Sequence, residues 1–281
     1  WLTEARLKGA KVVVIATDYS ATMCKADEGL IVRPGTTPAL ALGMCHVLLK
    51  EDRADLDYLK RFTDMPLLLR DDTGDLLRAD QLFPGYVNKE LQDVHILQAG
   101  EKLHPLQQSG PVIPDALRQS WGDYVVFDET TQAPRALSRD DMGEAFKKTG
   151  LQPSLEGAYD LQLADGTQVT CRPVFVHMKQ LIMESYDPAT VSEITWAPVE
   201  GIEAIARMIA DNQGKTSIAV GMGPNQFFNN DLKDRAQFLL AAMTGNIGRV
   251  GGNIGSYAGN YRAAFFSGLG QYIKEDPFNP Q

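Results

Sequence analysis

The sequence predicts an α/β fold with a doubly wound, mostly parallel sheet and an insertion of hairpins and loops. Apolar residues at helical spacing alternate with short β-branched runs over residues 1–50, and the same rhythm returns after residue 190. Residues 51–190 instead carry dense charge and frequent Pro, Gly and Gln, which favours hairpins and loops; a small independent α+β domain is the alternative. We therefore expect residues 1–50 and 191–281 to form the first and second parts of one α/β domain.

The first part is predicted to contain a helix, two strands and a second helix. Residues 2–8 have a helical pattern that ends at Gly9. Residues 11–17 read KVVVIAT, an apolar β-branched run typical of a strand that is buried on both faces. Residues 29–32 form a second short apolar stretch, and a Pro-Gly turn then opens a helix over residues 39–50.

The later elements show the same helical spacing and the same short strand patterns. Asp165 and Gly166 form a hairpin turn signal between two strand patterns. Ile202, Ile205 and Ile209 recur at the helical period, which predicts a helix with one buried face. The predicted strands span residues 124–128, 159–164, 167–176 and 217–220, and the predicted helices span residues 199–210 and 231–243.

Composition excludes several classes of protein. The chain has 281 residues, 44% of them hydrophobic and 22% charged, which is typical of a globular protein and excludes wholesale disorder. The net charge of −9 disfavours nucleic acid and anionic membrane surfaces as partners, because both attract basic patches. No apolar run approaches the ~20 residues that span a bilayer. The cysteines and histidines show no metal-ligand spacing, so we expect no metal site in this chain.

The two ends of the sequence lack the usual signals. The chain starts at Trp1 without Met or a signal-peptide pattern, and it ends in a loop-like stretch that contains Pro277 and Pro280. We therefore expect it to be a fragment of a larger multi-domain subunit.

Asp18 is the first candidate functional residue. It follows the predicted strand at residues 11–17, and ligands of open parallel sheets bind at the carboxyl ends of the strands. A carboxylate there can accept hydrogen bonds from a ribose or a guanine edge. The alternative is an Asp that caps the next turn.

The second candidate is the turn that precedes the helix at residues 39–50. Its residues are Arg33, Pro34, Gly35, Thr36 and Thr37. The turn offers backbone N–H groups and hydroxyls at a helix N-terminus, which suits an anion or the edge of a nucleotide. The alternative is that the threonines are ordinary N-cap residues.

Two glycine-rich stretches are the third and fourth candidates. Residues 221–226 read GMGPNQ after a predicted strand and before a helix, which allows close approach to a pyrophosphate; a simple strand-end turn is the alternative. Residues 244–253 read TGNIGRVGGN, and 10 of the 25 glycines lie between positions 221 and 270. Such loops let backbone approach a large polar ligand, with a flexible linker as the alternative. These patterns alone predict a nucleotide-binding α/β domain of the dinucleotide-binding type.

In this order, the four stretches resemble those of molybdopterin oxidoreductases of the dimethyl sulfoxide reductase family. In that family a strand ends in Asp, a P-G-T-(D/T) turn opens an Ala-rich helix, a V-G-x-G strand end precedes an Asn-containing loop, and L-T-G-N-I-G-R-x-G-G follows a helix. The resemblance covers essentially the whole chain. The matching stretches are residues 16–19, 33–39, 220–226 and 243–252.

Other stretches resemble the nitrate reductase branch of this family. They are residues 61–68, 77–80 and 124–128. Residues 252–262 are more similar to nitrite oxidoreductase alpha subunits and their exported relatives than to membrane-bound respiratory nitrate reductase alpha chains.

The resemblance implies a molybdenum cofactor with two molybdopterin guanine dinucleotides. Thr37 stands where the family turn more often has Asp, so a hydroxyl replaces an acceptor carboxylate. The metal-ligating Asp and the [4Fe-4S] cluster segment of this branch have no match here, so we expect the catalytic residues to lie outside this chain. The residues implied as cofactor-binding are Asp18, Tyr19, Arg33, Pro34, Gly35, Thr36, Thr37, Gly221, Gly223, Asn225, Gln226, Asn246, Gly251, Gly252, Asn260 and Arg262.

The implied function is nitrite oxidation to nitrate by oxygen-atom transfer, with electrons leaving through iron–sulfur clusters. The alternatives are a respiratory nitrate reductase alpha subunit, a related chlorate or selenate reductase, and a nucleotide-binding scaffold domain without catalysis. The implied partners are an iron–sulfur electron-transfer subunit and a haem subunit, with membrane association only through them. The periplasm is the expected compartment, and the cytoplasmic face of the membrane is the alternative.

Overall fold

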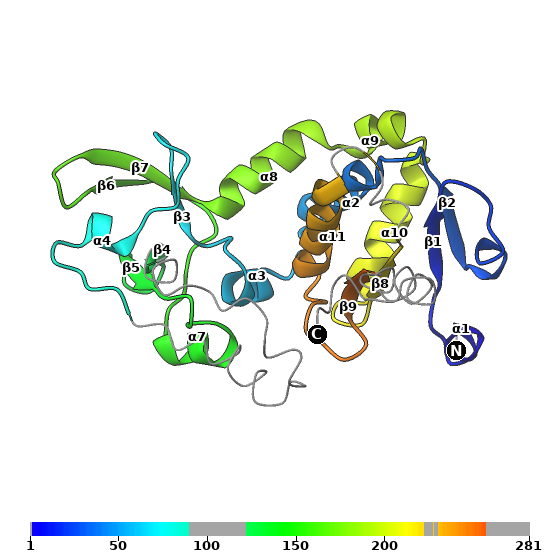
Figure 1. Cartoon of the computed structure of the whole chain (residues 1–281), viewed down its shortest axis with the longest axis horizontal. Coiled ribbons are helices and arrows are strands. Elements are labelled where there is room, and N and C mark those ends of the chain that lie inside the picture. The colour runs from blue at the N-terminus through cyan, green and yellow to red at the C-terminus, as the bar shows by residue number, and fades with distance from the viewer. Residues whose placement is uncertain (1, 90–121, 222–226, 228–229, 257–281) are drawn as a thin grey trace, which may run out of the picture. The chain divides into compact units, whose positions relative to one another are not determined.

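A computed structural model of the chain describes residues 2–89, 122–221, 227 and 230–256 (Figure 1). The chain divides into two compact units. One comprises Trp1–Asp55 together with Ile182–Gln281, and the other comprises Leu56–Leu181. The predicted division at residues 50 and 190 stays a prediction, and the fold is mixed α/β with small sheets.

The first unit contains two separate pairs of parallel strands. After helix α1 (Leu2–Leu7), strand β1 (Val13–Ala16) pairs with β2 (Glu28–Ile31). Later in the chain, β8 (Ser217–Val220) pairs with β9 (Asn253–Ser256). In the part of the chain that the structure describes, β1 and β8 form no ladder with each other, so one continuous doubly wound sheet is not confirmed.

Strand β1 is less buried than its sequence predicts. Its side chains are half-buried or exposed, and Ile15 is 38% exposed. The expectation of a strand buried on both faces was therefore wrong for this structure. The reason is that, among the described residues, β2 pairs with one edge of β1 and no strand covers the other edge of β1.

Asp27 joins α1 to the first strand pair. Its carboxylate accepts a hydrogen bond from the Val12 backbone N–H at 2.9 Å and forms an ion pair with Arg6 at 3.2 Å. The Val12 N–H and the Arg6 guanidinium lower the pKa of the Asp27 carboxyl below its usual value, because both stabilise the charged form.

Helix α2 (Thr37–Lys50) is the central helix of the first unit. It packs against α9 (Pro188–Thr195), α10 (Val199–Asp211) and α11 (Asn230–Met243), and Figure 1 shows it between α10 and α11. Its sequence is rich in Ala and Leu, and a Pro in its first turn suits the helix start. Because the helix has neighbours on several sides, nearly every residue from Leu40 to Leu49 is buried.

Close helix packing depends on Gly43. A Cβ atom at this position would lie 2.9 Å from both γ-carbons of Val191 on α9. Val191 is fully buried, and a β-branched side chain has few rotamers with which to give way. Gly43 therefore sets how closely α9 approaches α2.

The amino end of β8 is fixed by Asn246, which is fully buried. Its Oδ1 accepts a hydrogen bond from the Thr216 backbone N–H at 2.9 Å, and its Nδ2 donates to Thr244 Oγ1 at 2.7 Å. The Thr216 carbonyl in turn accepts from the Asn253 N–H at 3.2 Å, at the start of β9. One buried amide therefore links the amino ends of two parallel strands.

The second unit is built around antiparallel strands. One sheet has the order β3-β7-β6, and β4 pairs with β5. Leu68, Leu77, Val125 and Cys171 are fully buried in its main apolar cluster. Its elements are α3 (Leu56–Phe62), β3 (Leu68–Arg70), α4 (Ala79–Leu82), β4 (Tyr124–Asp128), β5 (Ala133–Leu137), α7 (Gly143–Thr149), β6 (Tyr159–Gln162), β7 (Gln168–Pro173) and α8 (Val174–Ser185), of which α8 continues into the first unit.

Two predicted strands of the second unit are shorter than expected, and the first of them, β6, ends at Gln162 instead of residue 164. The apolar pattern over residues 167–176 predicted a strand, but β7 ends at Pro173 and α8 begins at Val174. Pro173 has no N–H to donate to a sheet ladder, which favours the end of a strand. The Val174 N–H then bonds to the Leu67 carbonyl at 2.9 Å as the chain turns into the helix.

The contact between Gly43 and Val191 gives a first prediction. We expect Gly43→Ala to lower the free energy of unfolding by about 1–3 kcal/mol through overpacking. In an uncrowded helix the same change would stabilise by up to about 1 kcal/mol. Urea unfolding should also show that Gly43→Ala is better tolerated in a Val191→Ala background. Stabilisation by the single substitution would contradict this account.

The buried amide of Asn246 gives a second prediction. We expect Asn246→Ala to lower the free energy of unfolding by about 1–3 kcal/mol, because the Thr216 N–H loses its partner. Asn212→Ala is the matched control, since Asn212 is exposed and its Nδ2 bonds to the Met208 carbonyl on the surface. That control should change the free energy by less than about 0.5 kcal/mol. Equal effects of both substitutions would rule out this role for Asn246.

Candidate functional site

Two predicted stretches follow neighbouring parallel strands at the same edge. The last register pair of β1 and β2 joins Ala16 to Ile31, and Asp18 and Arg33 each lie two residues beyond it. The carboxyl ends of parallel strands meet at one edge of a sheet, where ligands of α/β folds bind. Asp18 and Tyr19 are exposed, with Tyr19 68% exposed, so both are open to a ligand.

The turn that opens α2 is held by its own hydrogen bonds. The Arg33 N–H donates to the Thr195 carbonyl at 2.8 Å, and the Thr36 hydroxyl donates to the Arg33 carbonyl at 2.7 Å. Thr36 is the N-cap residue of α2, but its hydroxyl makes no capping bond to the helix. The interpretation of Thr36 as an ordinary side-chain cap is therefore not supported.

Arg33 lies over an aromatic ring. Its guanidinium carbon is 5.7 Å from the centre of the Trp196 ring, a cation–π arrangement, and Trp196 is 66% exposed. Trp196 ends α9 in the left-handed backbone region, with φ of 65°. The end of α9 therefore supports a cation that stays accessible at the edge of the strand pair.

The loop after β8 meets the same turn. Gly35 has φ of +79°, and a Cβ atom there would lie 3.3 Å from Cγ of Phe227. Phe227 follows the predicted glycine-rich stretch at residues 221–226. The structure therefore brings the turn at residues 33–37 next to Phe227, which directly follows the glycine-rich stretch at residues 221–226.

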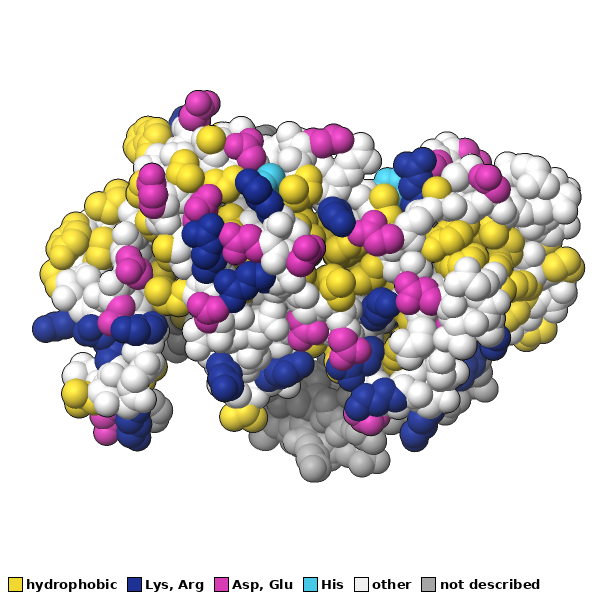
Figure 2. Space-filling model, turned by 180° about the vertical axis from the view of Figure 1, so that it is seen from behind, with side chains coloured by type: hydrophobic (Ala, Val, Ile, Leu, Met, Phe, Trp, Pro, Cys, Tyr) yellow, Lys and Arg dark blue, Asp and Glu magenta, His cyan; other side chains and the backbone are white. Residues whose placement is uncertain are grey.

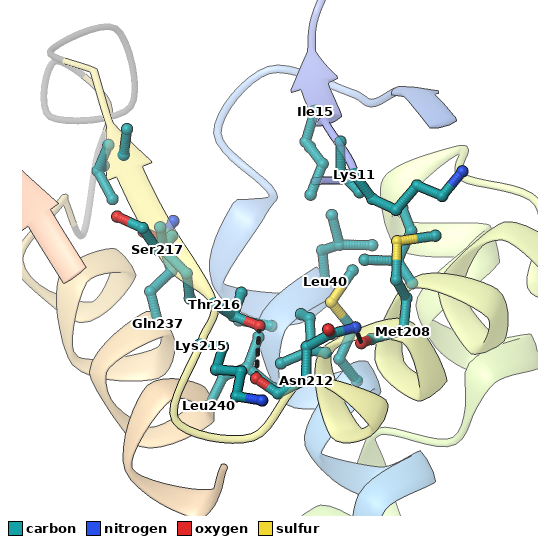
Figure 3. A pocket seen from close by; sticks show the side chains of 18 of the residues that line it. Lys11, Ile15, Leu40, Met208, Asn212, Lys215, Thr216, Ser217, Gln237 and Leu240 are labelled. Atoms are coloured by element: carbon teal, nitrogen blue, oxygen red, sulfur yellow. Dashed lines mark hydrogen bonds between the residues drawn. The ribbon is translucent and has the colours of Figure 1, made fainter. Parts of the chain in front are cut away.

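A cavity of about 390 Å³ lies between β1 and β8 (Figure 3). Gly221, at the carboxyl end of β8, lines it together with Thr37 at the start of α2. Apolar side chains from α2, α10 and α11 also line it, including Leu40, Ile205 and Leu240. The cavity thus connects two of the predicted stretches within the first unit.

Two buried polar atoms at this cavity have no hydrogen-bond partner among the described residues. They are Thr37 Oγ1 and Gln237 Oε1. An unsatisfied buried polar group destabilises a protein, so most such groups are satisfied by water, an ion or a ligand. The chemistry of the Thr37 hydroxyl fits a polar ligand that reaches the start of α2.

The fourth predicted stretch lies at the other end of β8. Asn246, Gly251 and Gly252 belong to the loop that leads from α11 into the amino end of β9. Asn246 uses its amide to hold Thr216, just before β8 begins. The stretch therefore does not join Gly221 at the carboxyl edge, and a direct contact of these three residues with a cofactor stays a prediction.

The remaining predicted positions lie outside the described residues. They are Gly223, Asn225, Gln226, Asn260 and Arg262.

Three residues near the site were missed by the sequence analysis. The sequence pattern gave no sign that Trp196 or Phe227 lies at the site. Trp196 contacts Arg33 and Phe227 contacts Gly35 only through tertiary packing. Gln237 could have been found: it lies one helical turn from buried Leu240 and Ala241, so it is a polar residue on an apolar face of α11.

Charge is intermixed on one face of the molecule. On the face shown in Figure 2, basic and acidic side chains alternate rather than gather by sign. An example is Arg207, which pairs with Glu51 at 2.7 Å and with Glu203 at 3.0 Å. Such exposed pairs contribute little to stability.

Within the described ranges, no group of three or more His, Cys, Asp or Glu side chains is placed to hold a metal ion. Burial raises the pKa of the Cys45 thiol, and it raises the pKa of Cys171 to about 11, so neither favours the reactive thiolate. None of the described helices is both long and apolar enough to span a membrane.

Comparison with known proteins identifies relatives over nearly the whole chain. The perchlorate reductase subunit alpha of Dechloromonas aromatica is 33% identical over 270 residues, which cover 96% of this chain and 28% of that protein. The respiratory nitrate reductase subunit alpha of Haloferax mediterranei is 32% identical, with 95% of this chain and 25% of the relative covered. The respiratory nitrate reductase 2 alpha chain of Escherichia coli is 28% identical, with 92% and 25% covered.

The chain therefore spans about a quarter of the length of these curated relatives. Among solved structures, acetylene hydratase from Pelobacter acetylenicus matches with a TM-score of 0.45 and 15% identity, covering 88% of this chain and 19% of that one. A family model described as molybdopterin oxidoreductase matches residues 2–275. The family resemblance and its nitrate reductase branch are thus confirmed, and the chain belongs to the molybdopterin oxidoreductase family.

Proposed function

We propose that this chain forms part of a doubly wound domain that binds the guanine dinucleotide form of the molybdopterin cofactor. The observations that carry this proposal are that Asp18 and the turn after β2 follow the carboxyl ends of paired strands, and that Thr37 of this turn lines one cavity with Gly221. Ligands of doubly wound folds bind at such an edge, where the strand order reverses. Membership of the molybdopterin oxidoreductase family supplies the identity of the ligand.

Each residue at this edge has a role that its chemistry supports. The Asp18 carboxylate accepts hydrogen bonds from the guanosine end, and the exposed Arg33 guanidinium offsets phosphate charge. The Thr37 hydroxyl, which has no partner among the described residues, bonds to the nucleotide in place of the carboxylate more common in the family. Gly221 lets the backbone approach the pyrophosphate or pterin closely.

The residues outside the described ranges extend this proposal. Gly223, Asn225 and Gln226 would continue the contact made at Gly221, and Asn260 and Arg262 would face the cofactor or the path of the substrate. Their support is the family resemblance of the sequence around them.

The bound molybdenum centre supplies oxygen-atom transfer, and this chain binds and orients the cofactor. We propose a small oxoanion as the substrate of the whole protein, because the relatives are nitrate and perchlorate reductases. Nitrite oxidation to nitrate is the direction favoured by the resemblance of residues 252–262. Nitrate reduction is the second candidate, supported by the names of the relatives.

The partners follow from the same comparison. Relatives named as alpha subunits imply further subunits. We propose an iron–sulfur subunit that receives the electrons, a haem subunit beyond it, and a periplasmic location with membrane association only through those subunits. Separation of the subunits of the native complex, with spectroscopy of each, tests these assignments.

Cofactor content tests the proposed function directly. Metal analysis and pterin release on the purified full-length protein should give about one molybdenum and two pterin guanine dinucleotides per chain. Nitrite-oxidising and nitrate-reducing rates, measured on that same preparation, then decide the direction. Absence of both molybdenum and pterin, in protein from a host that makes the cofactor, would favour the nucleotide-binding scaffold instead.

The proposed role of Asp18 predicts how a single substitution changes cofactor retention. Loss of a hydrogen bond to a charged group corresponds to about 1.5–3 kcal/mol, so Asp18→Ala should weaken retention of the cofactor by about 10–100-fold. Asp64→Ala is the control, because Asp64 is an exposed Asp in the second unit. Pterin bound after gel filtration is the measurement, and equal retention in the two variants would remove Asp18 from the site.

A further inference from the structure

Helix α9 ends at Trp196 in a backbone conformation that large side chains rarely adopt. The φ and ψ angles of Trp196 are 65° and 1°, which lie in the left-handed region. Helix α7 ends at Gly150 in nearly the same conformation, with φ of 72° and ψ of 3°. Glycine is the usual residue at such a helix end, because a side chain strains the backbone there. Ending the helix therefore does not require the Trp196 side chain.

The Trp196 side chain does not fill the core either. It is 66% exposed, whereas Thr195 and Ala197 on either side of it are fully buried. The Thr195 hydroxyl donates to the Val191 carbonyl at 2.7 Å and accepts from the Ala197 N–H at 3.3 Å, so the backbone is held on both sides of the exposed ring. Strain that persists at an exposed, well-anchored residue is typical of ligand-binding positions.

Arg33 is the residue that this ring contacts. Besides the cation–π contact of 5.7 Å, the Arg33 N–H donates to the carbonyl of Thr195, the residue before Trp196, at 2.8 Å. The two residues are therefore connected through the backbone as well as through their side chains. Arg33 is exposed, and no carboxylate among the described residues forms an ion pair with it. Arg207, by comparison, pairs with two glutamates.

A guanidinium that rests on an aromatic ring stays available to an oxyanion. Its N–H donors lie in its own plane, so contact through its face leaves them free for two parallel hydrogen bonds to a phosphate. The ring also restricts the Arg33 side chain before a ligand binds, which reduces the entropy lost on binding. Arg33 follows the carboxyl end of β2, and Asp18 follows that of β1. This edge therefore carries a hydrogen-bond acceptor and a cation.

We propose that Trp196 is a positioning residue, which holds Arg33 in place to bind a phosphate of a guanosine diphosphate group. The inference rests on the proposed function, in which Asp18 receives the guanosine end of the dinucleotide and Arg33 offsets phosphate charge. Trp196 itself does not touch the phosphate. It fixes the Arg33 guanidinium at the edge of the strand pair, where the guanidinium donates hydrogen bonds to the diphosphate.

Retention of the dinucleotide by the full-length holoprotein tests this role. Trp196→Leu should reduce retention about 5–30-fold, as expected when a cation–π contact shielded by a bound ligand is lost. Trp196→Tyr keeps an aromatic face and should stay within about threefold of the wild type. Phe62→Leu is the matched control, because it removes a cation–π contact of 5.4 Å with Arg61 in the second unit. Equal retention in Trp196→Leu and the control would overturn the proposal.

A double substitution separates positioning from direct contact. Arg33→Gln should weaken retention at least as much as Trp196→Leu does. Adding Trp196→Leu to Arg33→Gln should then reduce retention by less than about twofold more, because Trp196 acts through Arg33. Two losses that multiply in full would show that Trp196 acts without Arg33, and would overturn the proposal.

Trp196→Gly separates ligand binding from folding. Glycine is favoured at this φ, so the melting temperature of the full-length protein without cofactor should stay the same or rise. Retention of the dinucleotide should nevertheless fall as it does in Trp196→Leu. A lower melting temperature with unchanged retention would show that Trp196 only stabilises the fold, contrary to the proposal.

Guanosine diphosphate identifies the group that Arg33 binds. Full-length protein from a host that makes no cofactor should bind guanosine diphosphate more tightly than guanosine, and Trp196→Leu should reduce this preference without changing the affinity for guanosine. Nitrate, compared with chloride at equal ionic strength, should not displace guanosine diphosphate. No preference for the diphosphate would overturn the proposal, and displacement by nitrate would assign Arg33 to a substrate oxyanion instead.

The two proposals fail in different ways. A wild-type protein that retains no dinucleotide would overturn the proposed function together with this inference. Normal retention in both the wild type and Trp196→Leu would overturn the role of Trp196 alone.

Discussion

The packing of helix α2 against α9, α10 and α11 is the constraint on which the first unit depends. Gly43 permits the close approach of Val191, which fixes α9 against α2. The end of α9 then places Trp196 beneath Arg33, while the start of α2 carries Thr37 to the cavity. The positions of the candidate ligand groups are thus consequences of helix packing, and the residues that set them lie away from the site.

Strand direction decides which of the predicted stretches can act together. The chain enters β1 and β8 at one end and leaves at the other, so Asp18 and Gly221 follow carboxyl ends while Asn246 precedes an amino end. A single buried amide at the amino end fixes the start of β8, and through it the position of Gly221 four residues beyond Ser217. Asn246 can therefore influence the candidate site by positioning the strand that carries Gly221.

Much of the fold could be predicted from local patterns. The apolar stripe of Ile202, Ile205 and Ile209 is buried in α10 as predicted, and β8 covers the predicted residues 217–220. The predictions failed where a neighbour decides the outcome. The burial of β1 depends on what lies along its second edge, and the contact of Phe227 with Gly35 joins segments far apart in the sequence. Neither has a local signal, because periodicity reports which face is apolar and not what covers it.

The cavity between β1 and β8 also bears on how the site is assembled. In a doubly wound sheet the ligand lies at the switch point, where strands lead off in opposite directions. Here β1 and β8 line the cavity, while β2 and β9, the strands that pair with them, do not. Asp18 and Arg33 follow the carboxyl ends of β1 and β2, and Gly221 lines the cavity at the carboxyl end of β8. Because α2, α10 and α11 also line this cavity, their packing would fix the separation of the groups proposed to hold the cofactor, which couples helix packing to cofactor affinity through preorganisation.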